Sequence, residues 1–259
     1  AARLEFARDL AARHEAAVTA LFAVTRLEEM PYSYSAGADA AEEAVARHLR
    51  WRDEVKSSLQ QGSAGVGPEV AWFDLVGESA VSGFLAEAVY ADLLVVGQQA
   101  AGSAEPGGAP AGFAESVIIE SGKPVLVIPR AGRVESVGRR ALIAWNGSAQ
   151  AARAVTAALP LLRRADKVHA VTWARDPVLA PFSRIGIAEF LRRHGIAATL
   201  HLRDHSSHVG EALRELAREL DADLVVMGCY GRSRARERVL GGATRSALGT
   251  MPVALLMMH

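Results

Sequence analysis

Short, continuous apolar runs alternate along this chain with longer stretches in which apolar residues recur at helical spacing. The runs, such as residues 93–96 and 224–227, are rich in Val and Leu and are bounded by Gly or Pro. Such runs are typical of strands buried on both faces of a parallel sheet. Their alternation with helices predicts βαβ units and an α/β fold.

The pattern predicts elements over nearly the whole chain. We expect strands at 16–23, 69–75, 91–96, 124–128, 140–145, 167–173, 197–202, 222–227 and 252–257. We expect helices at 1–13, 38–60, 79–89, 112–121, 149–163, 180–194, 208–220 and 242–249.

The chain contains an internal repeat. Residues 91–97 (ADLLVVG) recur as 222–228 (ADLVVMG), and 123–128 (KPVLVI) are matched in the same order by 251–256 (MPVALL). Repetition of ordered segments indicates a repeated structural unit. We therefore predict two tandem, doubly wound α/β domains, residues 1–133 and 134–259, joined by a polar, glycine-containing linker.

The first repeat lacks a counterpart for one strand. Its opening Ala1-Ala2-Arg3 resembles Ala151-Ala152-Arg153, so the strand that matches 140–145 would precede residue 1. We expect that about ten residues are absent from this record, because a first strand normally lies centrally in a doubly wound sheet. The alternative is a truncated or rearranged half.

Glycines at fixed spacing follow the strand at 222–227. They form the pattern Gly228-x2-Gly231-x9-Gly241, which ends where a new helix starts. Glycine lets backbone amides approach an anion, and a helix N-terminus adds unpaired N–H groups and a positive dipole end. The segment predicts a phosphate-binding loop, with Arg232 as a further partner. The alternative is that these glycines only end one element and separate it from the next.

The strand at 140–145 ends in Asn146-Gly147-Ser148. In a doubly wound sheet, ligands bind beyond the carboxyl ends of the strands, where the winding direction reverses. Asn146 is therefore a candidate for binding a ribose or base edge. A turn followed by a helix cap explains the same three residues.

The tandem organisation and the glycine motif resemble the universal stress protein family in its two-domain form. The resemblance implies Rossmann-like sheets of strand order 3-2-1-4-5 and ATP binding. It differs at Gly242, where ATP-binding members have Ser or Thr, and at Asn146, where they have Asp. Thr244 offers a replacement hydroxyl, and Val171 or Trp173 would face the adenine. The candidate binding residues are Ala144, Asn146, Ser148, Val171, Trp173, Met227, Gly228, Gly231, Arg232, Gly241, Gly242, Ala243 and Thr244.

The first repeat does not retain the motif. After Gly97 come Gln98-Gln99-Ala100, without the second glycine, so we expect no ATP there. The resemblance also implies that the two halves pack like the subunits of a one-domain dimer, through strands 124–128 and 252–257. Homodimerisation of the whole chain is a further expectation.

Composition narrows the compartment and the partners. The 259 residues carry 29 Lys and Arg against 29 Asp and Glu, so no basic excess favours nucleic acid. No apolar run reaches the roughly 20 residues that span a bilayer, and no secretory signal opens the chain. The single cysteine, Cys229, agrees with a cytoplasmic location. His201, His205 and His208 lie near Asp204, but surface histidines and a helix cap explain this segment without a metal.

Three functions are compatible with these features. The first is a stress-response protein in which ATP, or a similar adenine nucleotide with or without Mg²⁺, regulates contact with an unknown protein partner. The second is an interaction protein that binds no nucleotide. The third is a slow ATP hydrolase or autophosphorylating enzyme, although the sequence beside the motif offers no convincing carboxylate for Mg²⁺. A flavodoxin-like FMN protein is disfavoured, because Asn146-Gly147-Ser148-Ala149 is short for its phosphate loop.

Overall fold

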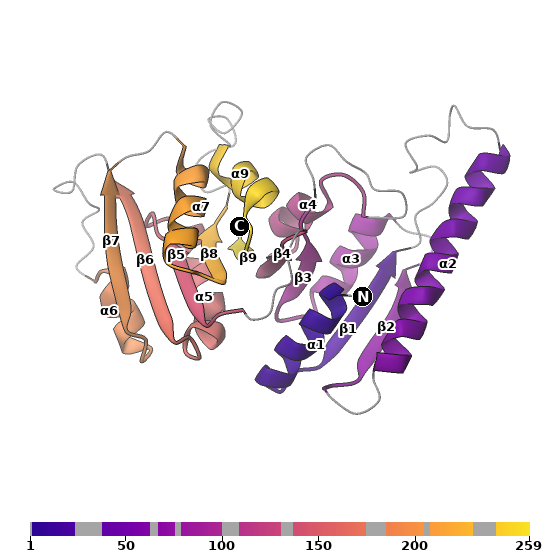
Figure 1. The fold of residues 1–259 in the computed structure, drawn as a ribbon, viewed down its shortest axis with the longest axis horizontal. Helices are drawn as coiled ribbons and strands as arrows, with labels where there is room; N and C mark the ends of the chain where they lie inside the picture. The colour runs from indigo at the N-terminus through magenta and orange to yellow at the C-terminus, as the bar shows by residue number, and fades with distance from the viewer. Residues whose placement is uncertain are drawn as a thin grey trace. The chain divides into compact units, whose positions relative to one another are not determined.

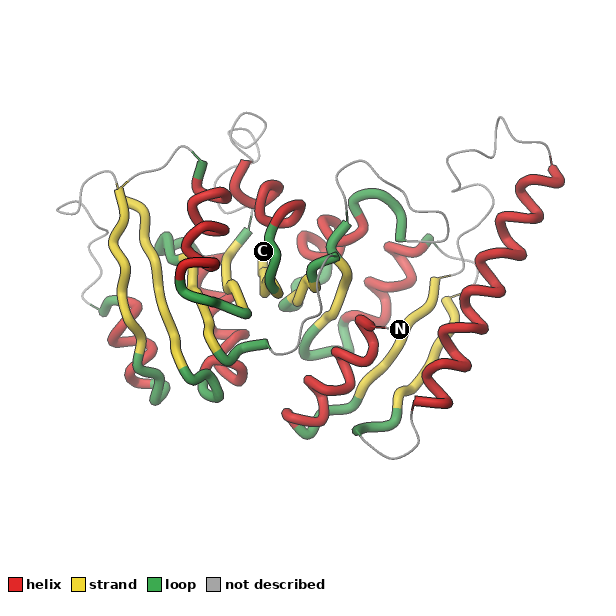
Figure 2. Tube along the Cα trace, viewed as in Figure 1, coloured by secondary structure: helices red, strands yellow, loops and turns green. Residues whose placement is uncertain are grey.

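The computed structural model shows an α/β protein (Figures 1 and 2). It describes residues 2–23, 38–62, 67–75, 79–99, 109–130, 137–174, 185–204, 208–229 and 242–259. The chain forms two compact units. The N-terminal unit comprises Ala1–Ala91 with Ala100–Ser121, and the C-terminal unit comprises Asp92–Gln99 with Gly122–His259.

The N-terminal unit contains two parallel strands and the helices around them. Its elements are α1 (Ala2–His14), β1 (Val18–Ala23), α2 (Ala38–Gly62), β2 (Val70–Leu75), α3 (Ala80–Ala88) and α4 (Phe113–Glu120). β1 and β2 pair in parallel from Val18↔Val70 to Ala23↔Leu75. α3 packs close to β2 because Gly83 has no side chain, and a Cβ there would lie 3.2 Å from Leu75 Cδ1.

The C-terminal unit contains a seven-stranded sheet. Its elements are β3 (Leu94–Gly97), β4 (Val125–Ile128), β5 (Arg140–Ala144), α5 (Ala149–Leu162), β6 (Lys167–Ala174), α6 (Ile187–Arg193), β7 (Ala198–Asp204), α7 (Val209–Glu219), β8 (Leu224–Gly228), α9 (Gly242–Thr250) and β9 (Ala254–Met258). The strand order is β3-β4-β9-β8-β5-β6-β7. From β7 to β9 this is the predicted order 3-2-1-4-5, which confirms the doubly wound topology of the second repeat.

Helices cover both faces of this sheet. Figure 1 shows α5 and α6 on one face and α7 and α9 on the other. The central strands are buried on both faces, and Leu142, Ile143, Val225 and Val226 are fully buried. This burial explains why the strands read as continuous apolar runs.

The last strands of the two repeats pair with each other, as predicted. β4 and β9 are antiparallel, with Val125 opposite Met257 and Val127 opposite Leu255. All other strand pairs in this sheet are parallel. Strands β3 and β4 of the first repeat thus belong to the same compact unit as the second repeat.

The sheet of the first repeat is divided. In the order 3-2-1-4-5 the first strand pairs with both the second and the fourth, which here are β1 and β3. The described residues contain no strand equivalent to β5 in this repeat, so β1–β2 and β3–β4 belong to different sheets. Among the described residues of the first repeat, the position of its first strand is therefore not filled.

A carboxylate fixes the start of β5 beside the start of β8. The two oxygens of Asp223 accept hydrogen bonds from the backbone N–H groups of Gly138, Arg139 and Arg140 at 3.0–3.1 Å. Gly138 has a φ of +84°, a conformation that favours glycine. This contact ties the amino-terminal ends of the two central strands together.

Candidate functional site

The carboxyl ends of three neighbouring strands bring several candidate residues together. Ala144, the last residue of β5, lies opposite Val171 of β6 and Met227 of β8. The backbone N–H of Trp145 donates to the carbonyl of Val171 at 2.8 Å, which extends the β5–β6 contact past the end of β5. These residues lie at the edge of the sheet where doubly wound folds bind ligands.

The loop after β5 is a tight turn that starts α5. Asn146 Oδ1 accepts a hydrogen bond from the backbone N–H of Ser148 at 3.0 Å, and Gly147 has a φ of +71°. Ser148 Oγ in turn accepts from the N–H of Ala151 at 3.2 Å and caps the helix. The turn-and-cap interpretation of these residues is therefore correct. Asn146 is exposed, and its side-chain amide group retains two N–H donors.

Gly228, the last residue of β8, lies against the first turn of α5. A Cβ at this position would be 2.3 Å from the backbone nitrogen of Ala151 and 2.5 Å from the carbonyl carbon of Gln150. A side chain there is impossible without moving the helix. The absence of a side chain on Gly228 thus allows the N-terminus of α5 to approach the end of β8. Sequence reasoning assigned this glycine to phosphate binding and missed its contact with α5.

The second helix at this end of the unit is α9, which begins at the predicted position. Gly242 and Ala243 form its first turn, and Thr244 follows with only 9% of its surface exposed. The first N–H groups of a helix have no partner within that helix. Gly231, Arg232 and Gly241 lie outside the described residues. Cys229, directly after β8, is buried, and its N–H donates to the carbonyl of Met258 at 3.1 Å.

A model of the universal stress protein family matches residues 138–259. Residues 138–259 are a universal stress protein domain. No curated protein sequence matches the chain. The likeness to solved structures extends over both repeats.

Two solved universal stress proteins match nearly the whole chain. A universal stress protein from Archaeoglobus fulgidus DSM 4304 is 18% identical with a TM-score of 0.66, covering 98% of this chain and 90% of that chain. A putative universal stress protein from Pseudomonas aeruginosa UCBPP-PA14 is 17% identical with a TM-score of 0.58, covering 98% and 87%. At these identities the likeness establishes the fold of the two repeats.

Another solved structure matches about half of the chain. A universal stress protein solved in complex with cAMP is 23% identical, with a TM-score of 0.36, over 47% of this chain and 96% of that chain.

Among the described helices of our protein, none has the length and apolar character needed to cross a membrane.

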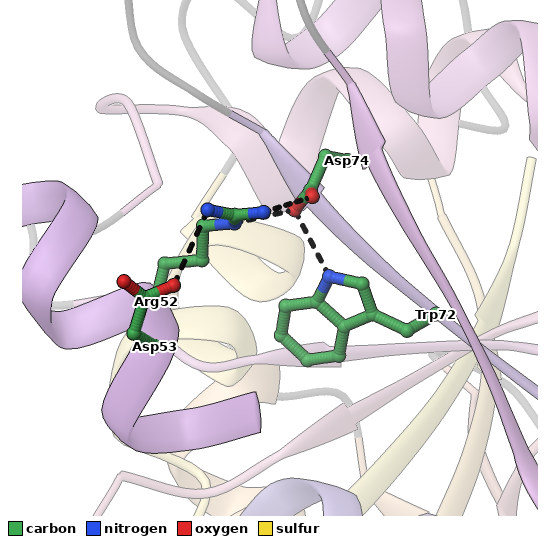
Figure 3. A network of polar contacts seen from close by, with 4 residues as sticks. All are labelled: Arg52, Asp53, Trp72 and Asp74. Atoms are coloured by element: carbon green, nitrogen blue, oxygen red, sulfur yellow. Dashed lines mark hydrogen bonds and ion pairs between the residues drawn. The ribbon is translucent and has the colours of Figure 1, made fainter. Parts of the chain in front are cut away.

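Outside the universal stress protein domain, the end of the β1–β2 pair carries a different set of residues (Figure 3). Arg52 of α2 donates to both carboxylate oxygens of Asp74, and Trp72 Nε1 donates to Asp74 Oδ1 at 2.9 Å. These hydrogen bonds, that from Arg52 first, lower the pKa of Asp74. Phe22 stacks on Trp72 with ring centroids 5.8 Å apart. The arrangement is an ion pair packed on an aromatic cluster that joins α2 to the strands.

The histidines of the universal stress protein domain are arranged differently from the sequence-based cluster. His201 lies on β7, and its Nε2 is 3.0 Å from Nδ1 of His169 on β6. His208 precedes α7, and His205 lies outside the described residues. Among the described residues, no group of three or more His, Cys, Asp or Glu side chains is placed to hold a metal ion. Sequence spacing missed the pair because its members come from separate strands.

Proposed function

We propose that the C-terminal domain, residues 134–259, binds ATP or a similar adenine nucleotide at the carboxyl ends of β5, β6 and β8. The close contact of Gly228 with the start of α5 carries this proposal. It brings a helix N-terminus, with its positive dipole end and N–H groups, beside the strand from which the glycine motif continues. The bound nucleotide would act as a regulatory ligand of a stress-response protein.

Different parts of the site would bind different parts of the nucleotide. The backbone of the Gly228-x2-Gly231-x9-Gly241 motif and the first turn of α9 would hold the phosphates, with Arg232 and Thr244 as side-chain partners. The wall formed by Ala144, Val171 and Trp173 would face the base. This assignment requires few side chains with defined chemistry, since phosphate loops bind mainly through backbone N–H groups.

Two residues shape the expected affinity. Gly242 provides no hydroxyl, so Thr244 is the nearest side chain in α9 that offers one. Asn146 is neutral, and its Oδ1 already accepts from Ser148. Only its amide N–H groups would then contact a ligand, as donors to a ribose or base acceptor. We therefore propose a binding site whose affinity comes mainly from the phosphates, with Mg²⁺ bound through the nucleotide.

The second candidate function is an interaction protein of the same fold, and the exposed Asn146 at the strand end favours it. Saturable nucleotide binding separates the two candidates. An ATP hydrolase remains the third candidate, and release of inorganic phosphate from a stoichiometric complex is its readout. In each case we propose that β4 and β9 join the two sequence repeats as the last strands join the subunits of a one-domain dimer, and that the chain forms homodimers.

The test is a calorimetric titration of the full chain with ATP, with and without Mg²⁺. The variant Gly231→Val/Gly241→Val alters the motif. Gly186→Val is the matched control, because no atom of the described residues lies within 4 Å of a Cβ at Gly186 and its φ of −75° suits any residue. We expect one site per chain, lost in the double variant and retained in the control. Absence of binding to the intact protein would support the interaction-protein alternative.

A further inference from the structure

Two imidazoles meet on one face of the sheet, beside Val171 of the proposed nucleotide site. His169 is opposite Thr199, and His201 is opposite Val171, in the parallel β6–β7 register. Residues two apart on a strand share a face, so the two histidines are diagonal neighbours on the same side. Both are half-buried, and their ring centroids are 5.2 Å apart.

Charged residues on the same two strands lie near the histidine pair. Lys167 lies two residues before His169 and is exposed, and Arg203 lies two residues after His201. Arg203 is paired with Glu219 of α7 at 3.5 Å. Burial, followed by the charges of His201 and Lys167, lowers the pKa of His169.

The spacing of the nitrogens suits a chelate. Two nitrogens bound to one metal at about 2.0–2.1 Å are about 2.9 Å apart at a right angle and about 3.4 Å apart at a tetrahedral angle. The observed separation of 3.0 Å is close to the right-angled value. Square-planar or tetragonal coordination by nitrogen is characteristic of Cu²⁺ and Ni²⁺, and among divalent ions Cu²⁺ binds such ligands most tightly.

We propose that His169 and His201 form a two-histidine binding site for a divalent transition metal with tetragonal coordination, and that Cu²⁺ is the ion bound most tightly. The two imidazoles occupy adjacent coordination positions, and solvent oxygens fill the others. Both histidines lie on paired strands rather than on a loop, which fixes the separation of their backbones before the metal arrives. The competing interpretation is a simple imidazole–imidazole hydrogen bond that has no metal affinity.

Lys167 gives the site a distinctive electrostatic property. Its positive charge is on the same face and opposes a bound cation, so replacing it removes a repulsion. The variant Lys167→Gln should therefore bind Cu²⁺ more tightly than the parent. A copper ion bound elsewhere on the surface would not respond to this change.

The test is titration of the metal-free full chain with Cu²⁺ in the absence of nucleotide, followed by calorimetry and electron paramagnetic resonance. His169→Gln and His201→Gln should each weaken Cu²⁺ binding at the tightest site by at least roughly tenfold. Removing a residue that only supports a metal ligand already costs about 10- to 100-fold in affinity, so loss of a ligand itself should cost no less. The resonance spectrum of the parent should show two coordinated nitrogens, and that of each variant one fewer.

The matched control is His194→Gln. His194 lies at the end of α6, where its Nδ1 is 3.2 Å from an Arg163 nitrogen, and it has no part in the pair. This variant should bind Cu²⁺ as the parent does. Equal affinity of the parent and both pair variants, with each variant folded by circular dichroism, would overturn the proposal. The test does not depend on nucleotide binding, because no nucleotide is present.

Discussion

A Cβ on Gly228 would lie 2.3 Å from the backbone nitrogen of Ala151, although the two residues belong to elements far apart in sequence. Gly228 ends β8, and Ala151 lies in the first turn of α5. The contact explains why a strand that is otherwise Leu, Val and Met ends in glycine. It also brings the helix N-terminus to the edge of the sheet where we propose that the nucleotide binds.

The variant Gly228→Ala should unfold at a lower urea concentration than the parent. The added carbon meets backbone atoms of Gln150 and Ala151, which cannot rotate away, so we expect a loss of about 3 kcal/mol or more. Gly249→Ala is the control. Gly249 is exposed within α9, and a Cβ there would have no atom of the described residues within 4 Å. Alanine at this position should stabilise the protein by about 0.5–1 kcal/mol. Equal stabilities of the two variants would contradict the packing role of Gly228.

Ser148 separates helix capping from ligand binding. Ser148→Ala removes the acceptor for the N–H of Ala151 and should cost about 1 kcal/mol in urea unfolding. Ser148→Asp keeps an N-cap acceptor and adds a negative charge, so it should retain the stability of the parent but weaken ATP binding. Ser148→Asp is informative because the retained cap acceptor preserves stability, whereas the added negative charge repels the phosphates. Unchanged ATP affinity in Ser148→Asp would place the phosphates away from α5.

Asp223 should contribute more to stability than its exposed neighbours. Its carboxylate accepts from three backbone N–H groups, and hydrogen bonds to charged groups are stronger than neutral ones. We expect Asp223→Ala to lower the free energy of unfolding by about 2–3 kcal/mol. Asp166→Ala removes the exposed ion pair with Arg139 and should cost less than about 0.5 kcal/mol. Similar losses in the two variants would show that the hydrogen bonds of Asp223 stabilise the fold no more than an exposed ion pair does.

His169 should make stability depend on pH below neutrality. Its pKa in the folded protein is lower than the ordinary value of 6.5, so below that value the unfolded chain binds the proton more readily. The free energy of unfolding should therefore fall as the pH drops from about 6.5 to the folded pKa, and His169 should contribute no slope above that range. In metal-free buffer, urea titrations should show a smaller slope for His169→Gln. An identical slope in this variant would contradict the shifted pKa.

Much of the fold was predictable because its signals are local. The apolar runs gave strands within a few residues of those observed. The contact of β4 with β9 was implied by the resemblance to the universal stress protein family, and the structure shows that the pairing is antiparallel. The alignment of Ala1-Ala2-Arg3 with the residues that follow β5 indicated a missing strand, but the division of the first sheet into two was not predicted. The strand positions and the repeat needed only spacing and order along the chain.

The site was less predictable because its contacts join distant segments. Nothing near Gly228 in the sequence indicates that it packs on Gln150 and Ala151. His169 and His201 share no motif, and only the parallel register of β6 and β7 brings their nitrogens to 3.0 Å. Sequence spacing instead grouped His201 with its sequence neighbours His205 and His208. Register between strands is set by the packing of the whole sheet, so single-sequence spacing does not reveal it.

Hydrogen–deuterium exchange of the full chain with saturating ATP tests the central claim most directly, because it reports where the ligand acts. We predict slower exchange at 144–151 and 227–229 and in the first turn of α9. Exchange at the ends of β1 and β2, residues 22–23 and 72–75, should not change. Protection that is absent from the ends of β5 and β8, or confined to the N-terminal unit, would contradict the proposed nucleotide site.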